Sequence, residues 1–351
     1  MENVTSKTVA PNDFFLDRPD YEEGYDEESN TVVRLVSPKK KNAKAYKVTN
    51  IDDVASKNNW KAWLYLAPAL ILVVIFLIYP LVNTIFISFM KNYDYTTGTF
   101  DGFTLDNFGM ILGLTEYNGV RETYFVSYAI PNTFLIVFVT VPVSTLLALL
   151  ISVGLNSIKW FQKFLQTVFF LPYVTNTIAV GMVFSVLFDQ NGIINYIFNL
   201  DITWIYGATY VPAMTVLMIY IVWSSLAFKI LIFLSGLQGI DKQYYQAAKI
   251  DAASGWKTLW RITVPLMSPQ ILYILITSFI GAFKEYTAVV GLFNGPGTTN
   301  GDYSMYTIVY YIYENLSTHT SWAAAAAVFL FVIILVFTVV QMQVSKRRVY
   351  Y

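Results

Sequence analysis

Apolar residues along this chain gather in long, nearly uncharged runs that are separated by shorter polar stretches. Backbone polar groups inside a bilayer must be satisfied within the segment itself, so each run predicts a helix. About 20 residues, rising about 1.5 Å each, cross a hydrocarbon layer of about 30 Å, and every run is that long. We therefore predict an all-α polytopic membrane protein with about six transmembrane helices. The runs lie at about Trp63–Phe89, Phe125–Val153, Phe164–Phe188, Pro212–Leu234, Pro269–Phe293 and Ala323–Val344.

The composition agrees with this class and excludes several kinds of site. Charged residues make up 13% of the chain, whereas soluble domains carry about 25%. The formal net charge of +0 gives no basis for a nucleic-acid partner. The chain has no cysteine and one histidine, His319, so it offers no disulfide, thiolate or metal site. We expect no cofactor and no catalytic group.

Lysine and arginine gather on one side of the predicted topology. Of the 23 basic residues, only Lys91 and Arg121 fall on the opposite side, and Lys229 and Lys284 lie within predicted spans. An excess of positive charge marks the cytoplasmic side of a membrane protein. We therefore predict a multi-pass protein of the cell membrane with both termini in the cytoplasm.

Residues 1–60 differ from the rest of the chain. The first thirty residues are mainly acidic and lack the apolar stretch of a signal peptide, and the following residues are basic. Such a segment buries too little apolar surface to fold alone, so we expect a disordered cytoplasmic tail. The transmembrane domain is then residues 61–351, with its largest cytoplasmic loop at residues 235–268.

This loop is more amphipathic than a plain connector. Gln246–Ala252 favours a helix, and the small Ala247 and Ala248 allow close approach by a partner. We expect Ser254 to cap a second short helix, which Pro265 ends before the fifth span. A helix, a break and a helix at the membrane surface suit docking into a groove of another protein.

The loop resembles the signature segment of the permeases of binding-protein-dependent ABC importers. The family pattern is Glu-Ala-Ala, two residues, Asp-Gly-Ala, then an aromatic segment that ends in Ile-x-Leu-Pro. Eight positions match in register: Ala247, Ala248, Asp251, Ala253, Trp256, Trp260, Ile262 and Pro265. Gln246 stands where the family has glutamate, and Ala252 stands where it has glycine. Without that glycine we expect the bend to move to Gly255.

The resemblance covers about Asn59 to the C-terminus. Leu171-Pro172-Tyr173, Trp223, Phe279–Lys284 and Gly295-Pro296-Gly297 are similar to the carbohydrate branch, the maltose-type permeases. The resemblance implies two copies of a separate ATPase, a second permease, an extracytoplasmic solute-binding protein, a carbohydrate cargo and surrounding membrane lipid. This chain carries no phosphate-binding loop motif of its own. The implied ATPase-coupling residues are Gln246, Ala247, Ala248, Asp251, Ala252, Gly255 and Pro265.

The same resemblance places the substrate pathway on three spans. Its candidates are Tyr173, Thr177, Ser224, Ser225, Phe228, Ser278, Ala282 and Glu285. Serines within spans also serve as small packing residues, so that interpretation stays open for Ser224 and Ser225. Ionisable groups within spans are costly and usually face a cavity. We expect Glu285 to face the pathway, Lys284 to be structural and Lys229 to extend toward the cytoplasmic surface.

Three alternatives to a carbohydrate importer would each need particular features. An importer of the same family for a non-sugar solute would need the same coupling loop. A secondary carrier would need no ATPase and would carry inverted repeats and broken helices. A membrane-embedded enzyme would need paired acid, base or metal groups, which the chain does not supply.

Overall fold

The computed structural model describes residues 21–26, 31–36, 59–117, 119–158, 162–296 and 305–345. The chain divides into two compact units, Met1–Ile71 and Leu72–Tyr351. In the first unit, β1 (Tyr21–Asp26) pairs antiparallel with β2 (Thr31–Val36). In the register of this hairpin Tyr21 lies opposite Val36 and Asp26 lies opposite Thr31. The disordered tail predicted for residues 1–60 stays a prediction, and most of that segment lies outside the described residues.

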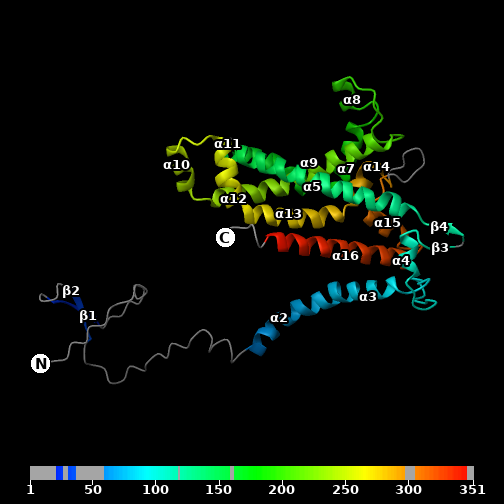
Figure 1. Cartoon of the computed structure of the whole chain (residues 1–351), viewed down its shortest axis with the longest axis horizontal. Helices are drawn as coiled ribbons and strands as arrows, with labels where there is room; N and C mark the ends of the chain where they lie inside the picture. Colours follow the sequence, from blue (N-terminus) through cyan, green and yellow to red (C-terminus); the bar gives the residue numbers. More distant parts are fainter. Residues whose placement is uncertain are drawn as a thin grey trace. The chain divides into compact units, whose positions relative to one another are not determined.

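The helix α2 (Asn59–Val73) runs across the boundary between the units, and the remaining elements belong to the second unit. Figure 1 shows their arrangement. In chain order they are the π-helical turn η1 (Val74–Ile78), α3 (Tyr79–Ser88), α4 (Asp106–Ile111), the short strands β3 (Glu116–Tyr117) and β4 (Val120–Arg121), the π-helical turn η2 (Phe125–Ala129), α5 (Ile130–Ser157), α6 (Gln162–Val174), α7 (Thr177–Leu187), α8 (Ile193–Phe198), α9 (Tyr210–Gly239), α10 (Lys242–Ile250), α11 (Gly255–Thr258), the π-helical turn η3 (Leu259–Thr263), α12 (Val264–Leu266), α13 (Ser268–Phe283), α14 (Thr287–Phe293), α15 (Ile308–Asn315) and α16 (Thr320–Ser345).

The predicted polytopic helical fold is confirmed. Among the described residues, four helices are long and apolar enough to cross a membrane: Trp63–Ser88, Phe125–Ser157, Tyr210–Gly239 and Thr320–Ser345. A fifth span is possible if the bent pair Gly255–Leu266 and Ser268–Phe283 counts as one. The exact number of six remains a prediction.

The third and fifth predicted spans are not continuous helices. The third consists of α6 and α7, which are separated at Thr175 and Asn176. The fifth consists of α13 and α14, which are separated at Lys284–Tyr286. The apolar pattern continues through both breaks, so hydrophobicity alone gave the extent of each span but not its division into two helices.

Three prolines of the described chain, Pro80, Pro131 and Pro265, follow π-helical turns and lie inside helices. Each π-helical turn of the described chain ends two residues before a proline, as η1 does before Pro80 and η3 before Pro265. A proline ring clashes with the carbonyl four residues earlier and offers no N–H. In η3 the Val264 N–H instead bonds the Leu259 carbonyl, five residues back. The wider turn accommodates the proline, and the helix continues.

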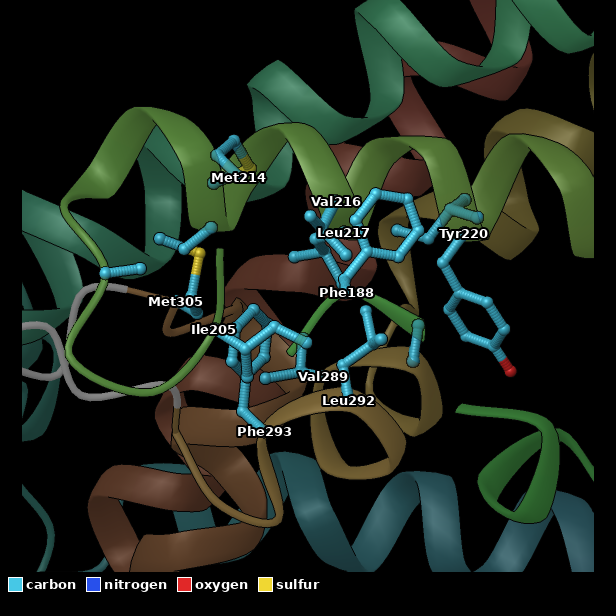
Figure 2. Packing of buried hydrophobic residues seen from close by; sticks show 14 of the residues in the cluster. Phe188, Ile205, Met214, Val216, Leu217, Tyr220, Val289, Leu292, Phe293 and Met305 are labelled. Carbon is cyan, nitrogen blue, oxygen red and sulfur yellow. The ribbon is translucent and has the colours of Figure 1, made fainter. Parts of the chain in front are cut away.

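The second halves of the two broken spans pack against each other and against α9. Figure 2 shows Leu217 and Tyr220 of α9 on the side of that helix where Val289 and Leu292 of α14 lie, and all four side chains are buried. On the opposite side of α9 lies α5, which also contacts α13. The helices α5, α6, α9 and α13 thus surround one region in the middle of the second unit.

Candidate functional site

A cavity of about 360 Å³ lies among α5, α6, α9 and α13. This volume falls within the range of small-molecule sites. Seven of the eight predicted pathway residues line it: Tyr173, Ser224, Ser225, Phe228, Ser278, Ala282 and Glu285. The fold therefore brings residues that are distant in sequence, and that the family resemblance predicted, together at one cavity.

The aromatic wall of the cavity joins α6 to α9. The rings of Tyr173 and Phe228 stack with centroids 5.8 Å apart and an interplanar angle of 20°. Close to Phe228, the Ser224 hydroxyl donates to the Ile221 carbonyl at 3.1 Å, and the Ser225 hydroxyl donates to the Val222 carbonyl at 2.9 Å. Each hydroxyl oxygen can still accept a hydrogen bond from a cavity occupant.

Glu285 occupies the break between α13 and α14. Its Oε1 accepts hydrogen bonds from the backbone N–H groups of Tyr286 at 3.1 Å and Ala288 at 2.9 Å. Its backbone carbonyl accepts from the Thr307 hydroxyl at 2.8 Å. The carboxylate thus stabilises the start of α14 through one oxygen. Among the described residues Oε2 accepts no hydrogen bond, so it can accept one from a molecule in the cavity.

Thr177 is the predicted pathway residue that the cavity does not include. It is the first residue of α7, where its carbonyl accepts a hydrogen bond from the Tyr220 hydroxyl at 2.5 Å. Asn176, just before it, caps the helix by accepting from the Ile178 N–H at 2.9 Å. Thr177 therefore fixes the start of α7 to α9, a packing role rather than a place on the cavity wall.

Sequence reasoning missed the polar residues of the α5 wall and placed Lys229 wrongly. Lys229 is buried, lines the cavity and donates a hydrogen bond from Nζ to Ser144 Oγ. It cannot extend to the cytoplasmic surface, because α5 and α9 pack together around it. The four-residue spacing of Thr140 and Ser144 is the sequence signal for that wall. The cavity residues not predicted are Thr140, Val141, Ser144, Ile221, Lys229, Thr277 and Gly281.

A larger cavity of about 590 Å³ lies between α6 and α9. Its lining is mainly apolar, with Phe169, Phe170 and Leu234 among its residues, and it holds no ionisable group. It contains none of the predicted pathway residues. Within the described residues, no group of His, Asp and Glu side chains is placed to hold a metal ion.

The loop at residues 235–268 bends at Ala252, not at Gly255 as predicted. Ala252 has a φ of 50°, in the left-handed region that favours glycine. The Ala253 N–H bonds the Ala248 carbonyl at 2.9 Å, and the Ala252 N–H bonds the Lys249 carbonyl at 3.1 Å. This pair of bonds is the Schellman arrangement that ends a helix. Hydrogen bonding therefore holds the bend at the position where the family pattern has glycine, although this chain has alanine there.

The second helix of the loop begins as predicted and ends later. The Ser254 hydroxyl accepts from the Lys257 N–H at 3.3 Å and caps α11. The chain remains helical through Pro265 and turns by 71° only between Leu266 and Ser268. The Tyr245 hydroxyl lies 3.3 Å from the Thr263 hydroxyl, a hydrogen bond that connects α10 to η3. The helices of the loop are thus held together.

Five of the seven predicted coupling residues are exposed in the loop, and Ala248 alone among them is buried. Gln246, Ala247 and Ile250 are exposed on α10, and the Ile250 side chain is 86% accessible. Ala248 is buried against its own chain, so its small size serves the internal packing of the loop. Asp251, Ala252 and Gly255 are exposed, whereas Pro265 is half-buried. Trp256 and Trp260 are also exposed, with their rings 5.7 Å apart.

Comparison with solved structures supports the fold. One chain of the crystal structure of a bacterial ABC transporter involved in the import of the acidic polysaccharide alginate superposes with a TM-score of 0.69. The similarity covers 83% of this chain and 96% of that one, at 20% sequence identity.

Two curated relatives match most of the chain. The probable ABC transporter permease protein MG188 of Mycoplasma genitalium is 30% identical over 78% of this chain and 82% of its own length. The lactose transport system permease protein LacF of Rhizobium radiobacter is 26% identical over 82% of this chain and 94% of its own. The family model described as binding-protein-dependent transport system inner membrane component matches residues 141–350. The chain therefore belongs to the family of inner membrane components of binding-protein-dependent transport systems.

Proposed function

We propose that this permease moves a carbohydrate across the plasma membrane as one subunit of an ATP-driven importer. The observation that carries the proposal is the cavity among α5, α6, α9 and α13. It combines the stacked rings of Tyr173 and Phe228 with serine hydroxyls and the Glu285 carboxylate. An aromatic face beside hydrogen-bonding groups is the lining that a sugar ring and its hydroxyls require. The similarity to a lactose permease supports the same cargo class.

The proposed motor contact is the exposed face of α10 to α12. Ile250 and Trp256 present apolar surface beside the bend at Ala252, and such a surface suits insertion into a groove of a separate ATPase. Closure of two ATPase copies would then move the spans between inward-open and outward-open states. A second permease would complete the pathway, a solute-binding protein would deliver the cargo, and both termini would lie in the cytoplasm.

Broken helices do not favour the secondary carrier over this proposal. We expected a carrier to contain broken helices, yet α6–α7 and α13–α14 are broken in a chain of the importer family. Discontinuous helices place helix ends and polar groups near a transport site in either class. The energy source of uptake distinguishes the importer from the secondary carrier. Uptake into vesicles should stop without ATP while an ion gradient is maintained, and uptake driven by the gradient alone would favour the carrier.

Glu285→Gln tests the cavity directly. Glutamine keeps an oxygen that can accept from the Tyr286 and Ala288 N–H groups, so α14 should remain in place. It removes the charge that strengthens hydrogen bonds to sugar hydroxyls, so uptake should fall about tenfold or more. Glu314→Gln, an exposed position on α15, is the matched control and should transport normally. Unchanged uptake by the Glu285 variant, with normal assembly, would remove this cavity from the pathway.

A further inference from the structure

Lys229 is a cation in the wall of the cavity that no carboxylate neutralises. Its side chain is buried at 4% accessibility in the middle of α9. The single ion pair among the described residues, Arg121 with Glu116, lies in the short hairpin of β3 and β4. A lysine within a span is costly and is usually retained because it faces a partner or a transported molecule. Lys229 therefore requires an explanation that the packing of α9 does not give.

The hydrogen bonds of Lys229 leave donors unused. An ammonium group has three donors, and Nζ makes one described hydrogen bond, to Ser144 Oγ. The Ser144 hydroxyl in turn donates to the Thr140 carbonyl. Two ammonium hydrogens therefore have no acceptor among the described residues, although Lys229 lines a cavity large enough for a small molecule.

Thr140 supplies an independent observation at the same wall. Its Oγ1 is buried and has no hydrogen-bond partner among the described residues. Thr140, Ser144 and Lys229 all line the cavity. Buried polar groups are almost always paired. A hydroxyl without a partner and an ammonium with unused donors in the wall of one cavity therefore point to an acceptor that enters the cavity. Glu285 also lines the cavity, but its Oε1 is occupied by the backbone of α14, and no ion pair joins it to Lys229.

We propose that Lys229 and the Thr140 hydroxyl bind an anionic group of the transported carbohydrate, a carboxylate or a phosphate. An anion accepts several hydrogen bonds at once and would use both the ammonium and the hydroxyl donors. Hydroxyls on the same molecule could then donate to Glu285 Oε2 while its ring lies against Phe228. The cargo is an acidic sugar derivative rather than a neutral sugar. This inference rests on the proposed function, because it concerns the occupant of the same cavity.

The test measures equilibrium binding of probes to the purified permease complex without its solute-binding protein. Any preference among the probes then comes from the permease cavity alone. Three probes distinguish the possible cargoes: trigalacturonate carries carboxylates, sn-glycerol 3-phosphate carries a phosphate, and maltotriose is neutral. At least one acidic probe should bind about tenfold more tightly than maltotriose, since hydrogen bonds to charged groups are the stronger ones. Which acidic probe binds identifies the anionic group. Equal or tighter binding of maltotriose would overturn the inference.

Variants separate recognition from packing. Lys229→Gln should abolish the preference for the acidic probe and spare maltotriose, whereas Lys284→Gln, an exposed lysine outside the cavity, should retain it. Thr140→Val, which removes only the unpaired hydroxyl, should weaken acidic binding severalfold. If Lys229 only joins α9 to α5, Lys229→Gln and Ser144→Ala will lower assembly alike and leave the preference unchanged, and the inference fails. If Lys229→Gln does not assemble, the wild-type preference and Thr140→Val decide.

The outcome for the proposed function is distinct. Transport of maltotriose without preference for the acidic probes would retain a carbohydrate permease and remove only the anion site. Absence of ATP-dependent uptake of any carbohydrate, neutral or acidic, by the complete transporter would remove the proposed function itself.

Discussion

Gly181 of α7 and Gly291 of α14 meet backbone to backbone, at the contact between the second halves of the two broken spans. A β-carbon at Gly181 would lie 2.7 Å from the carbonyl carbon of Gly291. Such a distance is shorter than atoms tolerate, and neither neighbour is a flexible side chain that could move aside. Close approach of α7 and α14 therefore requires glycine, as small residues do at other contacts between membrane helices.

Gly181→Ala should destabilise the permease by about 1–3 kcal/mol, the usual cost of overpacking. Gly291→Ala should cost less, because its nearest contact, the Ile178 Cα, would be 3.2 Å away. Gly154→Ala, on α5 with nothing within 4 Å of the added carbon, is the matched control. Thermal unfolding in detergent measures all three. Equal transition temperatures for the Gly181 and Gly154 variants would contradict the described contact.

Ala252→Gly should stabilise the loop at residues 235–268 by about 1 kcal/mol, because glycine adopts the left-handed conformation without steric cost. Hydrogen exchange of the α10 amides is a suitable measurement, since α10 ends at this bend. Ala253→Gly, one residue further along, has no such strain to relieve and should leave exchange unchanged or faster. Faster exchange in the Ala252 variant would mean that the bend is not at this residue.

Asn176→Ala should destabilise α7 by about 1 kcal/mol, the usual value of an N-cap side chain. The loss should be local, because Asn176 accepts from Ile178 at the start of the helix that also holds Thr177 against Tyr220. Proteolysis at the break would then accelerate. Asn191→Ala, an exposed asparagine that caps no helix, should change stability by less than about 0.5 kcal/mol. Indistinguishable proteolysis of both variants would argue against the cap.

The sequence predicted where the helices lie better than how they are divided. The run expected at Phe125–Val153 is the helix Phe125–Ser157, because bilayer thickness and apolar length determine such an element locally. The break at Asn176 lies inside an equally apolar run. The sequence signal for the break is one asparagine, whose side-chain amide can take backbone N–H groups that a continuous helix would use. Whether it does so depends on the packing of α7 on α14.

The cavity was predicted in part for a similar reason. Tyr173 and Phe228 came from a family resemblance, which carries position but not side-chain direction. Whether Lys229 extends to the surface or turns inward depends on Ser144, a residue 85 positions away along the chain. Ala247 and Ala248 are adjacent and alike in sequence, yet only Ala247 is exposed. The chain that follows α10 turns back toward Ala248. Long-range packing of this kind leaves no local pattern.

The most direct test of the proposed importer asks whether the loop that contains α10 binds a separate ATPase. The chain has no cysteine, so Ile250→Cys introduces its only thiol, at a side chain that is 86% accessible in the isolated permease. A water-soluble maleimide should label it rapidly in the permease alone and at least about tenfold more slowly in the assembled transporter, while Ile193→Cys on α8 labels equally in both. Equal labelling of Ile250→Cys in the two states, with the ATPase present in the complex, would contradict the proposed docking of α10.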